Sequence, residues 1–521
     1  MVKKIIPFLG NNYNKILILI IILTSAFLRI YRISDYMTFL GDEGRDVIIV
    51  KGILEGNFTL LGPRVSAADF FTGPIYYYLM APFLWLSRLD PVGPAVMIAL
   101  FGIATVYLVY RVAKELFNET AGIIASSLYA VSPLVIAYSR SSWNPNPMPF
   151  FSLITLFTLY KTIKKTNWKY FLLIGILLGI SIQLHYQAVV LALVVAFFIF
   201  IARFYITKKI EVLNLIKYYT QVLAGFIIGF SPFLLFEVRH GFPNTKTVIT
   251  FVLSANLHQQ YTEGSSFLGI ISNVFFRLFG RLLTRFPPPE QISVSGNLLL
   301  QFWQVGTILL AIVSLLVLFK MKNKLIVIFF SVWLFTGILS FSFYKKAIYD
   351  YYFSFMFPLP FLLLSNSLSS FFKNRKFFYL LKISSLLIFF FLIFFNLLGM
   401  PFRFAPNRQK EQVKAISDFV LSKTVGKPFN FALITGGNSD HAYRYFFELA
   451  DRKPVTIENP AIDLQRRSVT NQLMVVCEDP YCQPLGNSLW EVAGFGRATI
   501  SGEWQVSVVK VYRLEHYMGK N

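Results

Sequence analysis

Long apolar runs constrain the fold of this chain more than any other feature of its sequence. Stretches of about 18 to 22 mainly apolar residues recur between Lys15 and Leu398, and a helix needs about 20 such residues to cross a bilayer. The composition agrees, because 55% of the 521 residues are hydrophobic and only 14% are charged. The sequence therefore predicts an all-α polytopic membrane protein with about 11 transmembrane helices, at about residues 15–32, 94–112, 121–138, 148–163, 169–184, 186–204, 218–236, 298–319, 324–341, 351–371 and 377–398.

The basic residues between these runs indicate how the chain is oriented. They gather in alternate loops, for example in 161–169, 203–209 and 373–376, and loops rich in Lys and Arg stay on the cytoplasmic side. This pattern predicts a multi-pass protein of the plasma membrane with a cytoplasmic N-terminus and an extracytoplasmic C-terminus. The formal net charge of +23 then reflects topology and contact with anionic membrane lipid, and no nucleic-acid partner is expected.

The first outer loop, about 33–93, is far too long for a simple connection, and it opens with an acidic cluster. Asp42, Glu43 and Asp46 lie within five residues, just after the first span. Asp42 and Asp46 are four residues apart, so they share one face if a helix begins here. Carboxylates at a membrane boundary need water, a cation or a partner. One interpretation is a chemical site, and the other is that Asp42 only N-caps a helix running to about Gly56.

The same loop contains Tyr76 and Tyr77, at the start of a short apolar segment that ends near Leu86. We expect this segment to be a helix at the membrane interface rather than a crossing, because Tyr and Trp favour the headgroup level. The Tyr rings offer flat faces against which a sugar can pack.

The other outer loops carry further polar residues near the membrane boundary, namely Arg140, Asn144, His185, Lys345 and Lys346. The two lysines run against the charge bias of outer loops and indicate an anionic partner. The histidine, in a tight turn, is either a hydrogen-bonded interface residue or a functional one. Arg277, Arg281 and Arg285 repeat every four residues, so we expect them on one face of a helix along the membrane, contacting lipid headgroups or a phosphate.

The composition changes after Met400-Pro401, which predicts a membrane domain at 1–400 and a small extracytoplasmic α/β domain at 401–521. The predicted elements are helices at about 408–422 and 439–449 and strands at about 430–435, 472–477 and 505–514. The turn Gly436-Gly437-Asn438 between a strand and a helix is a weak candidate for an anion site. Cys477 and Cys482 are close enough in sequence to permit a disulfide, which an extracytoplasmic location allows but does not require.

This inventory suits a reaction between a lipid-linked phosphate and a polar molecule outside the membrane. A carboxylate can take the proton from an attacking hydroxyl or amine. A departing phosphate needs its growing charge met by Arg, Lys, His or a divalent cation.

Several segments strengthen this interpretation by resemblance. The order of a first span, Asp42-Glu43 in a long outer loop, Gly73-Pro74-Ile75-Tyr76-Tyr77-Tyr78-Leu79 and later Tyr138-Ser139-Arg140 resembles the GT-C superfamily of polyprenyl-phosphate-sugar-dependent membrane glycosyltransferases. The likeness is greatest to the branch of protein O-mannosyltransferases and lipid A aminoarabinose transferases, over about residues 15–240. Beyond that region it rests on hydropathy alone.

The resemblance implies specific roles. Asp42 is the expected catalytic base and Glu43 its support or a substrate-orienting residue, in a transfer that inverts the anomeric carbon as a polyprenyl phosphate leaves. Asp46, Arg140, Asn144, Tyr76 and Tyr77 are the expected substrate-binding residues.

Two departures from the family pattern leave a divalent cation open and its ligands unknown. Thr72-Gly73-Pro74 replaces a His or Lys before Pro-Pro, and Asn144 and Asn146 occupy a region that is acidic in several relatives. His185, Lys345 and Lys346 therefore become substitute candidates for contacting the phosphate.

The sequence thus predicts a glycosyltransferase that uses a polyprenyl-phosphate-linked sugar on the extracytoplasmic face. The alternative is a membrane transporter or lipid flippase of an envelope glycan pathway, which would place ionisable residues within the spans. A third interpretation is an assembly scaffold whose outer domain binds a cell-wall polymer. The donor sugar and the acceptor, whether protein, lipid or glycan, are not specified by the sequence.

Overall fold

The computed structural model describes residues 2–65, 69–165, 167–254, 266–285, 297–344, 348–373, 378–479 and 481–518. The chain forms two compact units. The first comprises Met1–Tyr31, Phe58–Met80 and Ala95–Ala405, and the second comprises Arg32–Asn57, Ala81–Pro94 and Pro406–Asn521. The second unit therefore combines the C-terminal region with two segments of the long loop that follows the first helix. A division into domains at 1–400 and 401–521 stays a prediction.

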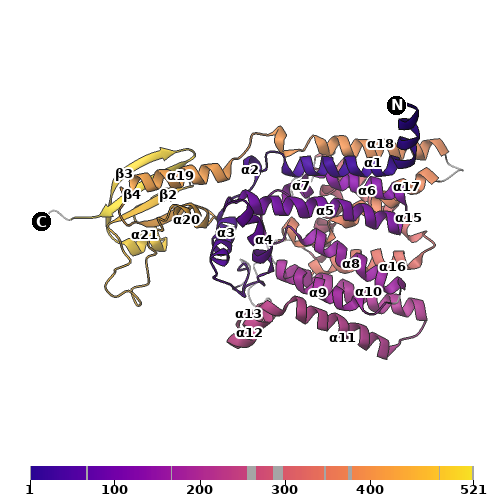
Figure 1. Ribbon diagram of the computed structural model, residues 1–521, viewed down its shortest axis with the longest axis horizontal. Helices are drawn as coiled ribbons and strands as arrows, with labels where there is room; N and C mark the ends of the chain where they lie inside the picture. Colours follow the sequence, from indigo (N-terminus) through magenta and orange to yellow (C-terminus); the bar gives the residue numbers. More distant parts are fainter. Residues whose placement is uncertain are drawn as a thin grey trace. The chain divides into compact units, whose positions relative to one another are not determined.

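The named elements of the first unit are all helical (Figure 1), and among its described residues Arg64 and Phe71 also form an isolated antiparallel β-bridge. Its helices are α1 (Val2–Ile30), α4 (Ile75–Leu86), α5 (Val92–Leu116), α6 (Glu119–Val131), α7 (Pro133–Tyr138), α8 (Met148–Lys165), α9 (Tyr170–Leu184), α10 (Val189–Thr207), α11 (Val212–Gly229), α12 (Ser231–His240), α13 (Pro243–Ser254), α14 (Phe267–Phe275), α15 (Leu298–Phe319), α16 (Lys324–Phe341), α17 (Pro358–Lys373) and α18 (Phe378–Leu397). Short helical turns are η1 (Tyr186–Ala188), the π-helical η2 (Phe276–Arg281), η4 (Asp350–Met356) and η5 (Pro401–Arg403). The boundary between the units falls within α4 and α5.

Among the described residues, seven helices are long and apolar enough to cross a membrane: α1, α5, η1 with α10, α11, α15, α16 and α18. An eighth is added if η4 and α17, which are bent by 51° relative to each other, form one broken span. All eleven predicted spans lie on helices, and the prediction of an α-helical polytopic membrane protein is confirmed. The predicted number of crossings is larger because α8, α9 and the α6–α7 pair do not meet these criteria of length and composition.

Proline breaks two of the predicted spans. The segment 121–138 is divided at Ser132, where Pro133 begins α7, and the segment 218–236 is divided after Gly229, where Ser231-Pro232 begins α12. Proline has no backbone N–H to continue a helix but fits its first turn. Both helix breaks therefore lie at prolines that can be identified in the sequence.

Four glycines pack α9 directly against α11. A Cβ at Gly175 would lie 2.0 Å from the carbonyl oxygen of Val222, and a Cβ at Gly225 would lie 2.0 Å from that of Leu172. Gly179 and Gly229, one turn further along each helix, also lie against backbone, since a Cβ there would be 2.7 Å from the Gly229 carbonyl carbon and 2.3 Å from the Ile176 carbonyl oxygen, respectively. Each helix thus carries glycines four residues apart, the pattern that allows transmembrane helices to approach at the backbone.

The second unit contains an α/β region and two short helices from the long first loop. Its elements are α2 (Ile33–Tyr36), α3 (Gly41–Leu54), α19 (Gln409–Lys423), β1 (Asn430–Ile434), α20 (His441–Leu449), β2 (Gln472–Cys477), α21 (Trp490–Phe495), β3 (Ala498–Val506) and β4 (Val509–His516). The sheet order is β1-β2-β4-β3, with β1 parallel to β2 and the other two pairs antiparallel.

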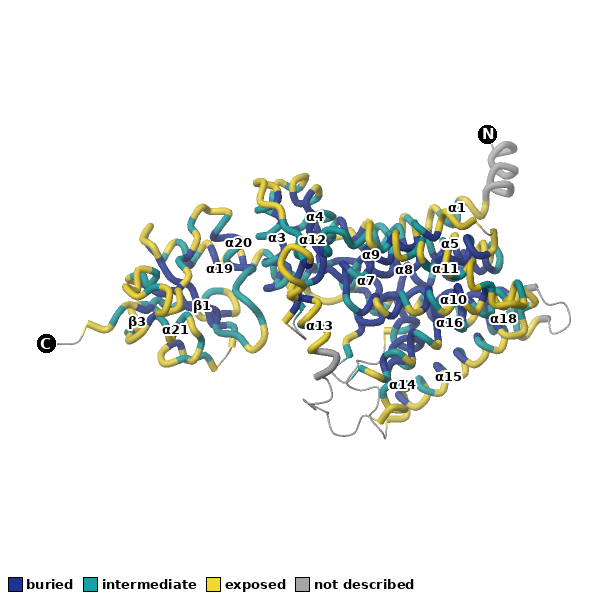
Figure 2. The backbone as a smooth tube through the Cα atoms, turned by 90° about the horizontal axis from the view of Figure 1, so that it is seen from below, coloured by how far each residue is buried: buried dark blue, intermediate teal, exposed yellow. Residues whose placement is uncertain are grey.

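The core of this unit lies on both faces of β2. Every residue of β2 is buried. The edge strand β3 is largely exposed (Figure 2). Leu473, Val475 and Cys477 pack with Val492 and Phe495 of α21 on one face. On the other face of the sheet, Phe431 of β1 packs against Tyr443 and Phe447 of α20. A continuous apolar run is the pattern expected of such a central strand.

Most predicted elements of the C-terminal region are confirmed. The helices at 408–422 and 439–449 correspond to α19 and α20, and the strands at 430–435 and 472–477 correspond to β1 and β2. The predicted strand at 505–514 is wrong as a single element, because it crosses the β3–β4 hairpin at Ser507, which has φ = 52°. Cys477 and Cys482 form a disulfide.

Candidate active site

The acidic cluster lies at the first turn of α3. Leu40 is the N-cap, and the Glu43 carboxylate accepts a hydrogen bond from its backbone N–H at 3.0 Å. This is the reciprocal half of a capping box, and it satisfies an amide before the helix begins. The alternative that Asp42 only N-caps the helix is therefore wrong, because Glu43 makes the capping contact.

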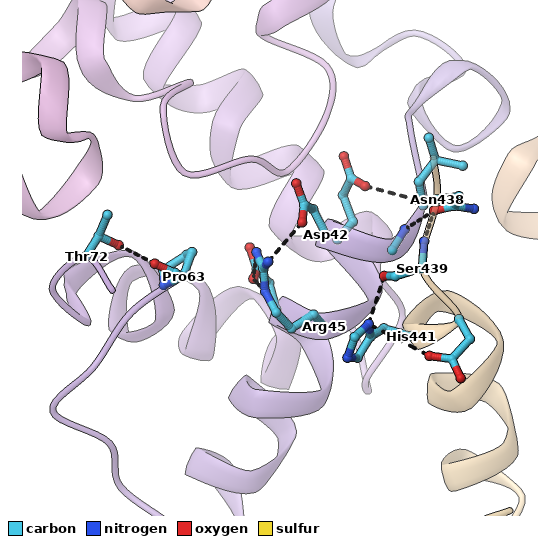
Figure 3. A network of polar contacts seen from close by, with 12 residues as sticks. Asp42, Arg45, Pro63, Thr72, Asn438, Ser439 and His441 are labelled. Carbon is cyan, nitrogen blue, oxygen red and sulfur yellow. Dashed lines mark hydrogen bonds and ion pairs between the residues drawn. The ribbon is translucent and has the colours of Figure 1, made fainter. Parts of the chain in front are cut away.

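Arg45 joins the two aspartates. Its Nη1 donates to Oδ1 of Asp42 at 2.8 Å, and its Nε and Nη2 donate to Oδ1 of Asp46 at 2.9 and 2.8 Å (Figure 3). The Asp42 side chain is 47% exposed, whereas that of Asp46 is fully buried. Asp46 therefore anchors Arg45 from within the protein, and Arg45 orients the accessible carboxylate of Asp42. The predicted contact between Asp46 and a substrate does not fit the full burial of the Asp46 side chain.

Glu43 differs from Asp42 in its environment. Burial raises the pKa of the Glu43 carboxyl to about 7, because the charged form loses its hydration. The Leu40 N–H opposes this shift, and the nearby carboxylates of Asp42 and Asp46 add to it. Near neutral pH, Glu43 thus holds a proton for about half of the time beside a more accessible carboxylate, which suits a supporting role.

The first turn of α3 contacts the segment 438–442. Oδ1 of Asn438 accepts from the Gly41 N–H at 2.8 Å. A Cβ at Gly41 would lie 2.0 Å from the Ser439 hydroxyl, and a Cβ at Gly44 would lie 2.3 Å from the Ala442 nitrogen. The two glycines beside the carboxylates therefore allow the helix to lie directly on the start of α20.

Ser439 and His441 lie beside this contact. Oγ of Ser439 and Nδ1 of His441 are 2.8 Å apart (Figure 3). Burial lowers the pKa of the His441 imidazole; Asp440 and Asp42 oppose this change, and Arg45 and Arg444 reinforce it. The sequence did not identify Ser439 and His441. The glycines on either side of Asp42-Glu43 could have indicated that another segment of the chain packs closely against this turn.

The turn Gly436-Gly437-Asn438 contacts other parts of the protein through Asn438, and an anion site at this turn stays a prediction. A Cβ at either glycine would meet no atom within 4 Å, and Asn438 binds the backbone of α3 and of Ser439. Its side-chain nitrogen donates to both oxygens of Glu478, at 3.3 and 3.2 Å.

Two predicted substrate-binding residues instead hold helix ends within the first unit. Arg140 is buried and donates to the carbonyl oxygens of Leu28 and Tyr31 at the end of α1, at 2.8 and 2.7 Å. Asn144 is also buried and donates to the Leu184 carbonyl at the end of α9, at 2.6 Å. Both side chains bind carbonyl groups that a helix C-terminus leaves without intrahelical partners, so these contacts indicate structural roles.

Tyr76 and Tyr77 are also buried, and the Tyr76 hydroxyl is 2.7 Å from the Ser142 hydroxyl. Their ring faces are therefore covered by protein, so the predicted stacking on a sugar does not fit this structure.

His185 is buried in an aromatic cluster, with ring centroids 4.6 Å from Tyr186 and 5.5 Å from both Tyr351 and Tyr352. Its Nδ1 accepts from the Gln187 N–H at 3.3 Å, and burial lowers the pKa of the imidazole. Lys345 and Lys346 lie outside the described residues.

Arg277 and Arg281 do not form a lipid-facing stripe. Nε of Arg277 is 2.6 Å from Oδ1 of Asp350, and Nη1 of Arg281 is 2.5 Å from its other oxygen. All three side chains are largely buried. The prediction of headgroup contact is therefore wrong for these two residues, because they pair with a carboxylate in η4 that the sequence places about 70 positions away.

Within the described residues, no three His, Cys, Asp or Glu side chains gather as a metal site. In the acidic cluster only Asp42 offers an exposed carboxylate, since Glu43 and Asp46 are buried. A divalent cation prefers about six oxygen ligands, so these residues do not fit a metal site made by protein alone.

Comparison with known proteins identifies relatives in sequence and in fold. Residues 72–236 match the profile of the dolichyl-phosphate-mannose-protein mannosyltransferase family. Over 208 residues the chain is 26% identical to YkcB of Bacillus subtilis (strain 168), whose assignment as a mannosyltransferase is itself provisional. That match covers 37% of this chain and 28% of the relative's length.

Two solved structures share the fold of nearly the whole chain. ArnT from Cupriavidus metallidurans, bound to undecaprenyl phosphate, matches with a TM-score of 0.63 at 11% identity, covering 96% of this chain and 98% of ArnT. The oligosaccharyltransferase AglB from Archaeoglobus fulgidus, in complex with an inhibitory peptide and a dolichol-phosphate, matches with a TM-score of 0.54 at 13% identity, covering 90% of this chain and 70% of AglB. The resemblance noted in the sequence is confirmed.

Proposed function

Because residues 72–236 match a mannosyltransferase family profile and nearly the whole chain shares the fold of ArnT and AglB, we propose that this chain is a GT-C membrane glycosyltransferase that transfers a sugar from a polyprenyl-phosphate donor to an acceptor on the extracytoplasmic face. The observation that carries this proposal is the accessible Asp42 carboxylate, which Arg45 orients at the start of α3. Two similar folds are solved with a polyprenyl phosphate or dolichol-phosphate bound, which supports a lipid-linked donor.

The proposed reaction is a single displacement. Asp42 accepts the proton of the acceptor hydroxyl or amine, whose oxygen or nitrogen bonds to the anomeric carbon of the sugar. The bond from that carbon to the phosphate oxygen breaks, and the electron pair leaves with the polyprenyl phosphate. Attack from the face opposite the leaving group inverts the anomeric carbon.

Arg45 and Glu43 support this step in different ways. Arg45 holds Asp42 in one orientation through the ion pair at 2.8 Å, and the buried Asp46 carboxylate holds Arg45 in turn. Glu43 fixes the first turn of α3 through the Leu40 N–H. A base kept in place before the substrate arrives needs less reorganisation in the transition state.

The direct test is Asp42→Asn, assayed in membranes supplied with labelled polyprenyl-phosphate sugar. Removal of a general base lowers the rate by about 100- to 10,000-fold, so we expect transfer to fall by that factor while expression and thermal unfolding remain as in the wild type. Asp69→Asn is the matched control, because Asp69 lies in the same outer loop, is exposed and pairs only with exposed Arg64 among its described neighbours. Transfer by Asp42→Asn within a few-fold of the wild type would remove Asp42 from the base role.

The proposed orientation has a separate test. A cysteine at the exposed β3–β4 turn, Val508→Cys, is expected to react with a membrane-impermeant maleimide in intact cells. A cysteine at exposed Lys165, at the end of α8, is expected to react only after the cells are opened. The reverse result would place the C-terminal region in the cytoplasm and contradict an extracytoplasmic acceptor.

A further inference from the structure

Three polar residues meet where the parallel strands of the second unit end. Thr435 and Asn438 follow β1, and Glu478 follows β2, with the Glu478 N–H donating to the Ile434 carbonyl at 3.0 Å. The carboxyl ends of parallel strands are the edge at which α/β sheets present functional residues. Tyr443 reaches the same point from the first turns of α20.

Glu478 is the centre of this group. Its carboxylate accepts from the Thr435 hydroxyl at 2.9 Å, from the Tyr443 hydroxyl at 2.8 Å and from the Asn438 amide nitrogen at 3.2 Å. These bonds determine which way the Asn438 amide faces, since its nitrogen must point to the acceptor. Its oxygen consequently points to the N–H groups of Gly41 and Ser439, each at 2.8 Å.

We propose that Glu478 and Asn438 are positioning residues for the catalytic turn, and that the C-terminal α/β region fixes the start of α3, where Asp42 lies. The inference rests on the proposed function of Asp42 and assigns the C-terminal region a task beyond binding an acceptor. The chain of contacts runs from the Glu478 carboxylate through the Asn438 amide to the Gly41 N–H, one residue before Asp42.

Other contacts along α3 agree with this role. Gly44 lies against the backbone of Ala442, where a side chain would not fit. Further along, the Lys51 ammonium is 3.2 Å from the Glu448 carboxylate of α20. Before the helix, the Phe39 ring packs on Tyr445 and Phe446 at 6.2 and 5.7 Å between centroids. The Asn438 bond acts on the Gly41 backbone, one residue before Asp42.

A reciprocal exchange of donor and acceptor tests the inference in the full-length protein. Asn438→Asp keeps the acceptor for the Gly41 N–H but replaces the donor to Glu478 with a second carboxylate. We expect its kcat to fall about tenfold with the donor KM within twofold of the wild type. In Asn438→Asp with Glu478→Gln, the new amide can again donate to position 438, and we expect kcat to recover to within about threefold of the wild type. Glu503→Gln, on exposed β3, is the control and should change nothing.

Hydrogen exchange of the peptide containing residues 38–46 gives a readout that needs no catalysis. We expect Asn438→Asp to speed exchange there by about tenfold and the double variant to restore protection. A double variant as impaired as Asn438→Asp in both measurements, or wild-type behaviour of Asn438→Asp, would overturn the inference. If exchange changes as expected but the wild-type protein transfers no sugar, the proposed function fails while the positioning contact stands.

Discussion

Two clusters of arginine and aspartate, one in each compact unit, have opposite compositions. In the acidic cluster, Arg45 lies between Asp42 and Asp46, and these three groups, without Glu43, carry a formal charge of −1. In the basic cluster, Asp350 lies between Arg277 and Arg281, and the formal charge is +1. In the acidic cluster one aspartate is 47% exposed, whereas in the basic cluster no side chain is more than 13% exposed.

The difference shows how one kind of ion pair serves two purposes. In the acidic cluster the ion pair between the partly exposed Arg45 and the buried Asp46 holds the accessible carboxylate of Asp42 in place, which is the geometry a base requires. In the basic cluster both guanidinium groups donate into one carboxylate, and Arg277 also donates to the Ile348 carbonyl at 2.6 Å and lies over the Phe353 ring. These contacts hold η4 against η2. The basic cluster therefore stabilises the fold, and the acidic cluster orients a reactive group.

The largest effect that distinguishes the clusters is expected from Asp350→Asn. The variant leaves two largely buried guanidinium groups without a carboxylate, and removal of one partner from a buried ion pair costs about 3–5 kcal/mol. We expect a loss of stability of that size, measured as the shift in thermal unfolding of the protein in detergent. Sugar transfer per folded molecule should remain near the wild-type rate.

Asp69→Asn serves as the control, since exposed ion pairs contribute about 0–1 kcal/mol and both Arg64 and Asp69 are exposed. Equal stability losses in Asp350→Asn and Asp69→Asn would show that burial does not govern the basic cluster. A loss of transfer in Asp350→Asn greater than the loss of folded protein would instead assign the basic cluster to the reaction.

The next largest effect concerns the pH dependence of the acidic cluster. Burial raises the pKa of Glu43 from 4.5 to about 7, so between these values the folded protein retains a proton that the unfolded chain has released. Stability from this group is therefore fully present below about pH 4.5, falls as the pH rises toward 7, and is constant above that. At about 1.4 kcal/mol per pH unit, the loss amounts to about 3 kcal/mol.

Glu43→Gln removes this titration while keeping an acceptor for the Leu40 N–H. We expect the variant to match the wild type near pH 4.5 and to be about 3 kcal/mol more stable at pH 8, as measured by unfolding across that range. A stability difference between Glu43→Gln and the wild type that does not change with pH would show that the pKa of Glu43 is the same in the folded and unfolded states, and that burial does not raise it.

The two clusters also differ in how far the sequence reveals them. Asp42, Glu43 and Asp46 lie within five residues, and the four-residue spacing of Asp42 and Asp46 places them on one helix face, so the acidic cluster could be recognised without coordinates. Asp350 lies 69 to 73 residues from its arginines, and periodicity within one helix could not identify that partner. The sequence alone therefore predicts an unpaired basic stripe that contacts either lipid headgroups or a phosphate.

The same limit applies elsewhere in the chain. The apolar runs predicted the helices. The glycines of α9 and of α11 are spaced by four residues, close to one helical turn, so this pattern is visible in the sequence. By contrast, Arg140, Asn144 and Tyr76 have the residue types of a sugar site, but each is buried against helix ends or a distant side chain. Residue type and position near a membrane boundary do not determine exposure. Asn438 and Glu478 follow strands β1 and β2, about 400 and 440 residues beyond Asp42 in the sequence, and only the fold brings them near it.

The smallest effect is expected from Arg45→Lys, which tests whether the acidic cluster acts through orientation. Lysine keeps the positive charge but presents one ammonium group in place of a planar fork, so it cannot reproduce the three bonds that Arg45 makes to Asp42 and Asp46. We expect stability to fall by about 1 kcal/mol and kcat to fall about tenfold with the donor KM unchanged. Arg64→Lys, in the exposed pair with Asp69, should leave both quantities at their wild-type values. If Arg45→Lys transferred sugar at the wild-type rate, a positive charge at position 45 would be sufficient for transfer. The orientation of Asp42 by Arg45 would then not distinguish the acidic cluster functionally from the basic cluster.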